Sequence, residues 1–317
     1  AGGEALPRCG RGGAGMRVLF WGTPEFAVPA LRALGDEAHD VVGVVTQPDR
    51  PAGRGRALGV SAVKRVALEE GIPVLQPERA VGDEFLAALR ALQPDVSVVV
   101  AFGQILKPAV LELPPRGSVN VHASLLPALR GAAPIQWAIL RGYETTGVTI
   151  MRMEAGLDSG PILFQVEEPI RPDESGGELA MRLAEVGAEA LIDALTLMEA
   201  GALSEAPQDH SRATYAPKLD RASARVEWGR PAVEVARWMR ALDAVPGAWS
   251  VLDGGVEVKL FRPRVEIQAG EPGTVLDVDE GEGVLIAAGE HAVRVREVQP
   301  AGRRRMAAGE WVRGRGV

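Results

Sequence analysis

The sequence predicts an α/β protein with a doubly wound, Rossmann-like sheet in residues 16–203 and a small β-barrel in residues 223–317. In the first segment, apolar stretches typical of buried strands alternate with stretches typical of helices, which indicates a parallel sheet with helical crossovers. In the second segment, short strand-like stretches follow one another between glycine turns at spacings of about 8–12 residues, which is typical of a small barrel. The chain is long enough for two domains with separate cores.

The elements of the first domain follow from the spacing of apolar residues. Strands are expected at short runs rich in valine and leucine, and helices where apolar residues recur three and four positions apart. Ser61 precedes one helical run and is a suitable N-cap. The expected strands are residues 17–21, 41–46, 96–101, 118–122, 148–153 and 162–166, and the expected helices are residues 25–34, 61–70, 82–92, 133–141 and 174–200.

An extended linker is expected at residues 204–222, because prolines and small polar residues interrupt any regular pattern there. Trp238, Trp249 and Trp311 are expected in the core of the domain that follows, since Trp238 stands at helical spacing with apolar neighbours. The elements expected in this domain are the helix 233–242 and the strands 248–252, 256–261, 273–277, 284–287 and 292–298.

The composition indicates a globular, cytoplasmic protein. The 317 residues include 46% apolar and 24% charged residues, and no apolar run approaches the roughly 20 residues that span a membrane. A single cysteine, Cys9, excludes an internal disulfide and is typical of a reducing compartment. Residues 1–15 are rich in glycine and arginine and lack the apolar stretch of a secretory signal, so we expect a disordered or non-native extension there.

Charge is unevenly distributed along the chain. The net charge is −7, yet residues 49–65 contain five basic side chains against Asp49 alone, and residues 294–317 contain seven arginines against Glu297 and Glu310. Two local basic patches on an acidic protein suit a few phosphate contacts rather than a surface that coats a duplex. Ordinary solvated surface charge is the competing interpretation.

Asn120, His122 and Asp158 are the strongest candidates for catalysis. Asn120 and His122 stand two apart in the predicted strand 118–122, so both project from one face near its carboxyl end, where α/β sheets bind ligands. An amide for an oxyanion, an imidazole for a proton and a supporting carboxylate suit acyl transfer to an amine. No serine or cysteine stands in a nucleophile motif, so we expect direct transfer. A hydrogen-bonded histidine at a strand end and an aspartate that caps a turn are the competing interpretations.

Five ordered motifs, which extend from about Met16 to the C-terminus, resemble the folate-dependent formyltransferase superfamily. The pair SVNVHASLLP and GLDSG carries the resemblance, and three further segments narrow it to members that formylate initiator methionyl-tRNA. The five motifs are residues 20–27 (FWGTPEFA), 46–56 (TQPDRPAGRGR), 118–127 (SVNVHASLLP), 129–136 (LRGAAPIQ) and 156–160 (GLDSG), and the resemblance continues through residues 214–219 (TYAPKL) in the linker.

The resemblance implies an OB-like C-terminal barrel, 10-formyltetrahydrofolate as cosubstrate and no metal. It implies that Asn120 stabilises the oxyanion and that His122 and Asp158 move protons, although it does not decide which of these two is the base. It also implies two segments that border the folate. Their residues are Phe102, Gly103, Gln104, Ile105 and Leu106 in one, and Ser124, Leu125, Leu126 and Pro127 in the other.

The resemblance further implies that the loop at residues 47–56 reaches the acceptor end of the tRNA, with Arg54 as the most telling match. The expected tRNA contacts are Arg50, Arg54, Arg56 and Lys64 near this loop, and Arg303, Arg304 and Arg305 near the C-terminus. The competing interpretation for each of these residues is an ordinary solvated surface charge, because surface loops and arginine runs usually have no binding role. The chain departs from many relatives at Ala128–Leu129 and at residues 241–248, outside the catalytic trio.

Other functions are less consistent with these residues. A formyltransferase for a purine ribotide would lack the C-terminal barrel, and one for an amino sugar would not be expected to carry the arginine-rich loop. An RNA-binding barrel on an inactive α/β domain would tolerate loss of the trio. A nicotinamide dehydrogenase needs a glycine fingerprint after the first strand, and residues 22–24 provide none. Scattered histidines offer no metal-ligand cluster, and we expect a monomer.

Overall fold

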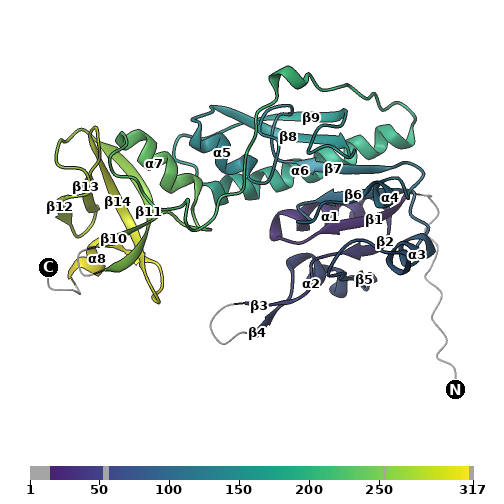
Figure 1. Ribbon diagram of the computed structural model, residues 1–317, viewed down its shortest axis with the longest axis horizontal. Coiled ribbons are helices and arrows are strands. Elements are labelled where there is room, and N and C mark those ends of the chain that lie inside the picture. Colours follow the sequence, from purple (N-terminus) through teal and green to yellow (C-terminus); the bar gives the residue numbers. More distant parts are fainter. Residues whose placement is uncertain (1–14, 53–56, 253–254, 314–317) are drawn as a thin grey trace. The chain divides into compact units, whose positions relative to one another are not determined.

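The computed structural model describes residues 15–52, 57–252 and 255–313 (Figure 1). Contacts divide the chain into two compact units. The first is formed by residues 1–121, 150–155 and 188–205, and the second by residues 122–149, 156–187 and 206–317. The domain bounds expected from the sequence, 16–203 and 223–317, stay a prediction.

A seven-stranded sheet carries the order β5-β2-β1-β6-β7-β8-β9. The pairs β1–β2, β1–β6, β2–β5 and β6–β7 are all parallel, as the alternating sequence predicted. The central strands are nearly continuous apolar runs because both of their faces are buried. The strands are β1 (Arg17–Gly22), β2 (Asp40–Val45), β5 (Val74–Leu75), β6 (Val96–Val100), β7 (Ser118–His122), β8 (Thr145–Arg152) and β9 (Ile162–Pro169).

Two of the helical elements, α2 and η2, begin after a residue whose side chain caps them. Ser61 confirms its expected role, because its Oγ accepts a hydrogen bond from the Lys64 N–H at 3.0 Å. The helix expected at 25–34 divides into a 3₁₀ turn and α1, which has a proline in its first turn, where a missing N–H is harmless. These elements are η1 (Glu25–Ala27), α1 (Val28–Asp36), α2 (Ala62–Glu69), α3 (Asp83–Ala91), α4 (Pro108–Leu111), α5 (Pro134–Leu140), α6 (Gly176–Glu199) and η2 (His210–Arg212).

Trp21 organises the core of the first unit at the end of β1. Its buried ring meets the rings of Phe102 and Phe85 edge to face, with centroids 5.2 and 6.1 Å apart. The indole N–H donates a hydrogen bond to Ser97 Oγ on β6 at 3.2 Å, so its one polar atom is satisfied inside the core. These contacts fix the carboxyl ends of two neighbouring strands.

The basic loop at residues 47–56 contains structure that the sequence did not predict. Its ends pair as a two-stranded hairpin, β3 (Arg50–Ala52) with β4 (Ala57–Gly59), which leads away from the sheet in Figure 1. The short strands carry no apolar alternation, so periodicity could not reveal them. Arg54 and Arg56, two of the expected tRNA contacts, lie outside the described residues.

The C-terminal part of the second unit is an antiparallel sheet in the order β10-β11-β14-β13-β12, with β15 paired to β14, as expected for an all-β second domain. Trp238, Trp249 and Trp311 pack against its core, which confirms the prediction for them. The elements are β10 (Trp249–Leu252), β11 (Val256–Glu266), β12 (Val275–Asp279), β13 (Gly283–Ala287), β14 (Ala292–Pro300), β15 (Met306–Ala307), α7 (Ala232–Ala241) and α8 (Ala308–Arg313). Across the described residues, no helix is long and apolar enough to cross a membrane.

Candidate active site

Strand β7 presents the first two candidate catalytic residues at its carboxyl end. Val119 and Val121 are buried, as a strand with one face in the core requires. Asn120 is half-buried, and its amide has no hydrogen-bond partner among the residues that the structure describes. A side-chain amide held in a strand with unused N–H donors can donate to a developing oxyanion.

His122 is the last residue of β7, and its imidazole is 6% exposed. Its Nε2 lies 3.0 Å from the backbone oxygen of Leu129. A carbonyl oxygen only accepts, so Nε2 must carry the proton in the neutral ring, and the lone pair is on Nδ1. The structure thereby leaves Nδ1 as the single position at which this ring can take up a proton.

Asp158 lies beside that nitrogen. Its Oδ2 is 3.8 Å from His122 Nδ1, so the fold brings together two residues that are distant in the sequence. The same oxygen accepts a hydrogen bond from the Gly131 N–H at 2.7 Å, and the side chain is only 19% exposed. Asp158 has φ of +47°, a left-handed conformation that is uncommon for a residue other than glycine.

The expected linker contributes residues that the sequence did not single out. Thr214 Oγ1 accepts from the Leu129 N–H at 2.9 Å, and Leu129 in turn bonds to His122. Gln208 is buried and donates to the backbone oxygens of Asp158 and Gly160 at 2.9 and 2.7 Å. A polar residue in a proline-rich stretch gives no periodic signal, so only the fold reveals these contacts.

The segment Ser124–Pro127 follows β7 as a closely bonded turn. Ser124 Oγ donates to the Ala128 oxygen at 2.6 Å, and the Leu126 N–H donates to Thr149 Oγ1 at 3.1 Å. Leu126 is buried, whereas Leu125 and Pro127 remain half-exposed and are free to border a ligand. The Leu126–Pro127 peptide bond is cis.

The second segment expected to border the folate, Phe102–Leu106, belongs to the first unit. The ring of Phe102 is committed to the core, and its carbonyl oxygen accepts from Thr23 Oγ1 and Gln47 Nε2 at 3.0 and 3.1 Å. Gln104 is bonded to the Ala80 N–H. Ile105 is 83% exposed and is the apolar side chain that this segment offers to a flat ligand.

The basic residues expected to contact tRNA fall into two groups. Arg50 is exposed at the base of the hairpin, whereas Lys64 is ion-paired with Asp49 and, by its hydrogen bond, lowers the pKa of that carboxyl. Arg303 and Arg304 are exposed and pair with no carboxylate within the described part of the chain. These two therefore remain suitable for phosphate contact.

Arg305 differs from its two neighbours. Its guanidinium pairs with both oxygens of Asp243, at 2.7 and 3.1 Å, and with Glu297, and it lies 4.0 Å above the ring of Phe261. An arginine held in this way mainly joins the loop after α7 to strands β11 and β14. Contact between Arg305 and tRNA stays a prediction, and it has less physical support because the guanidinium is already paired with two carboxylates.

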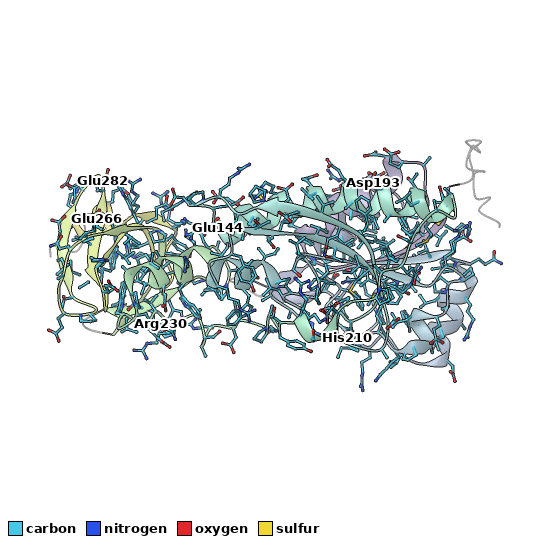
Figure 2. All side chains as sticks on the ribbon, turned by 90° about the horizontal axis from the view of Figure 1, so that it is seen from above. Glu144, Asp193, His210, Arg230, Glu266 and Glu282 are labelled. Carbon is cyan, nitrogen blue, oxygen red and sulfur yellow. The ribbon has the colours of Figure 1, made fainter. Side chains whose placement is uncertain are left out.

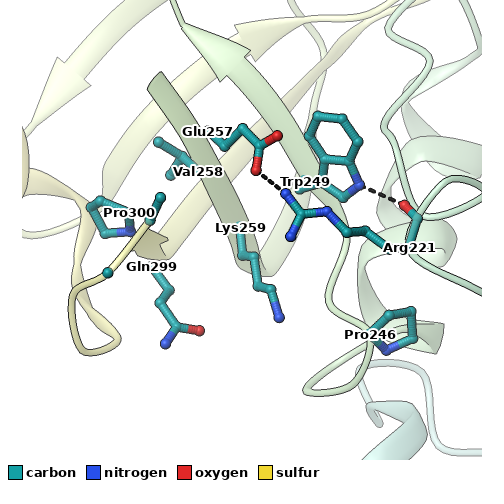
Figure 3. A pocket seen from close by; sticks show the side chains of 10 residues that line it. Arg221, Pro246, Trp249, Glu257, Val258, Lys259, Gln299 and Pro300 are labelled. Carbon is teal, nitrogen blue, oxygen red and sulfur yellow. Dashed lines mark hydrogen bonds and ion pairs between the residues drawn. The ribbon is translucent and has the colours of Figure 1, made fainter. Parts of the chain in front are cut away.

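A cavity of about 310 Å³ lies on the C-terminal sheet, and Figure 3 shows the side chains that line it. Arg221 lies 5.7 Å from the ring centroid of Trp249 and is ion-paired with Glu257, and Lys259 points into the same space. The residues that line this cavity include no histidine and no pair like His122 and Asp158. Within the ranges that the structure describes, no cluster of three or more His, Cys, Asp or Glu residues could hold a metal ion.

Comparison with known proteins agrees with this arrangement. The family model "Formyl transferase" matches residues 16–195, and "Formyl transferase, C-terminal domain" matches residues 218–316. Methionyl-tRNA formyltransferase of Symbiobacterium thermophilum is 49% identical over 306 residues, covering 95% of this chain and 93% of its own. The enzyme of the same name from Pseudomonas fluorescens is 50% identical over 287 residues and covers 90% of each chain.

Solved structures show the same fold at lower identity. HypX from Aquifex aeolicus in complex with tetrahydrofolic acid superposes with a TM-score of 0.67 at 21% identity, over 94% of this chain and 47% of its own. The sugar 3N-formyl transferase WlaRD gives a TM-score of 0.66 at 16% identity, over 92% of this chain and 100% of its own. With both family models and relatives near half identity over almost the whole chain, the protein belongs to the methionyl-tRNA formyltransferase family.

Proposed function

We propose that this protein transfers the formyl group of 10-formyltetrahydrofolate to the α-amine of initiator methionyl-tRNA. The observation that carries the proposal is the His122–Asp158 pair at the end of β7, where the Leu129 carbonyl fixes the tautomer of the ring. The names of the relatives supply the substrates, because both domains of the chain align with theirs.

The proposed reaction exchanges one C–N bond for another. The cosubstrate supplies a formyl group activated as an amide, whose bond to N10 breaks as the bond to the methionine amine forms. The amine loses one proton, and the released folate nitrogen gains one, so the reaction needs no oxidant or reductant. Asn120 is proposed to donate a hydrogen bond to the formyl oxygen as negative charge develops on it.

His122 is the proposed proton carrier, with Asp158 as its counter-ion. Because Nε2 is held as a donor to Leu129, Nδ1 is the ring atom that can accept the proton of the attacking amine. The carboxylate 3.8 Å away then stabilises the imidazolium that forms. The proton can afterwards return from Nδ1 to the leaving nitrogen.

The folate is proposed to lie against the half-exposed Leu125 and Pro127, which supply apolar surface for a flat ring. The tRNA is proposed to reach the hairpin loop through Arg50, Arg54 and Arg56 and the C-terminal domain through Arg303 and Arg304. We infer a cytoplasmic site of action from this substrate, because initiator tRNA is used by the translation machinery there. A monomer is sufficient for the proposed site.

The test is transfer of labelled formyl from 10-formyltetrahydrofolate to a set of acceptors. Charged initiator tRNA, charged elongator tRNA, amino sugars and purine ribotides would be compared under one condition. We expect labelling of the initiator methionyl-tRNA alone. Labelling of a small amine instead would retain the proposed chemistry and overturn the tRNA substrate, and an absence of labelling on every acceptor would overturn the enzyme assignment.

A further inference from the structure

Gln208 uses its whole amide group inside the protein. Gln208 is 6% exposed, and its Nε2 donates hydrogen bonds to the backbone oxygens of Asp158 and Gly160 at 2.9 and 2.7 Å. Its Oε1 accepts from Arg130 Nε and Nη2 at 3.1 and 2.6 Å. Both donors and both acceptor positions are therefore occupied, which fixes the orientation of the amide.

The two donated bonds end on the backbone of the loop that carries Asp158. They hold its carbonyl and that of Gly160, on either side of Ser159. Asp158 needs such support, because a left-handed conformation costs an L-residue about 1–2 kcal/mol. With the loop held there, the carboxylate reaches the Gly131 N–H and lies beside His122.

Arg130 connects Gln208 to the backbone on the other side of the His122–Asp158 pair. It is 4% exposed, and besides Gln208 its Nη2 donates to Nδ1 of His210, which is labelled in Figure 2. The residue before it, Leu129, holds the imidazole of His122 through its carbonyl, and the residue after it, Gly131, holds the carboxylate through its N–H. Arg130 and Gln208 together therefore set the distance between the two groups.

We propose that Gln208 is a positioning residue for formyl transfer that acts through the Asp158 loop. It donates to no group expected to touch substrate, so its effect must pass through the place and direction of the Asp158 carboxylate. A shift of about 1 Å in a reacting group can cost about 10²-fold in rate, and supporting residues around catalytic groups commonly contribute about 10- to 100-fold. The inference depends on the proposed function, since it concerns the same reaction.

The Gln208→Glu variant tests the hydrogen bonds to the loop carbonyls separately from those that Arg130 donates. A carboxylate at this position still accepts from Arg130, but it cannot donate to the two loop carbonyls and repels them. We expect kcat to fall about 10- to 100-fold while the KM values for both substrates change little, and the melting temperature to fall because two buried carbonyls lose their donor. Gln268→Glu is the matched control, because it makes the same change at an exposed position, and we expect it to keep wild-type kcat.

A double-mutant cycle with Asp158→Asn tests the route of the effect. If Gln208 acts through Asp158, then Gln208→Glu should reduce single-turnover transfer by less than about 3-fold when Asp158 is already asparagine. The pH profile of kcat should also change in Gln208→Glu, since Asp158 and His122 are then misplaced relative to each other. Equal losses in both backgrounds with an unchanged pH profile would overturn the positioning role.

Two further outcomes are decisive. A Gln208→Glu enzyme within about 2-fold of wild type would overturn the inference while the proposed function stands, and a wild-type enzyme without transfer would overturn the proposed function first. Should Gln208→Glu fail to fold, Gln208→Met replaces it, because methionine has a similar length and no charge. The same loss of kcat is expected for it, and normal kcat in this variant would again overturn the proposal.

Discussion

Replacement of Asp158 by asparagine removes one charge while it retains the shape that holds the loop. The asparagine oxygen can still accept the hydrogen bond from the Gly131 N–H, which is 2.7 Å long in the wild type. The change therefore mainly removes the attraction between the carboxylate and an imidazolium at His122 Nδ1, 3.8 Å away. At an effective dielectric constant of about 20, two unit charges at this distance attract by about 4 kcal/mol.

An attraction of about 4 kcal/mol in the transition state corresponds to about 10³-fold in rate, at roughly 1.4 kcal/mol for each factor of ten. Single-turnover transfer of labelled formyl to methionyl-tRNA, with saturating folate, measures this directly. Asp209→Asn is the control, because Asp209 is exposed and only caps a turn by accepting from Ser211. A rate for Asp158→Asn within about tenfold of wild type would refute the electrostatic reasoning, since the neutral side chain would then support His122 as well as the charged one.

Three other outcomes follow from the structure. Burial raises the pKa of the Glu174 carboxyl, but hydrogen bonds from Arg182 and a backbone N–H outweigh burial and lower this pKa below its ordinary value of 4.5. Glu174→Gln should therefore cost about 2 kcal/mol of stability at neutral pH. The difference in melting temperature between wild type and variant should shrink as the pH falls below 4.5. Arg303→Ala should reduce the salt dependence of tRNA binding by about one phosphate contact without loss of stability, whereas Arg305→Ala should lower the melting temperature. In ¹⁵N NMR spectra the neutral ring of His122 should carry its proton on Nε2, and a proton on Nδ1 would contradict the assigned tautomer.

The sequence predicted those parts of the fold that depend on periodic burial. Strand β7 was expected at its observed bounds because Val119 and Val121 alternate with polar residues, and α2 because Ser61 caps an amphipathic run. The hairpin β3–β4 was missed, since its short strands carry no apolar alternation in the sequence. The ion pair of Arg305 with Asp243 was missed for another reason: Asp243 is 62 residues away in the sequence, and charge counting cannot pair residues so far apart.

The sequence could predict those residues of the candidate site whose side chains stand in recognisable motifs. Asn120, His122 and Asp158 were identified by residue type and spacing, and the fold places the latter two within reach of each other. The tautomer of His122 could not be predicted from the sequence, because it depends on the Leu129 carbonyl, and a motif does not show where a backbone oxygen lies. Gln208 was missed because its partners are backbone carbonyls as well.

The expected linker, residues 204–222, contributes hydrogen bonds to the candidate site. Ala206 exchanges backbone hydrogen bonds with Ile162 at the start of β9, Gln208 holds the Asp158 loop, and Thr214 holds Leu129. Residues 206–317 likewise belong to the compact unit that contains His122. A catalytic domain that ended at residue 203 would therefore retain Asn120, His122 and Asp158 but lose the bonds that set the distance between the last two. The segment that follows α6 therefore holds the backbone beside His122 and Asp158 in addition to connecting the parts of the chain on either side of it.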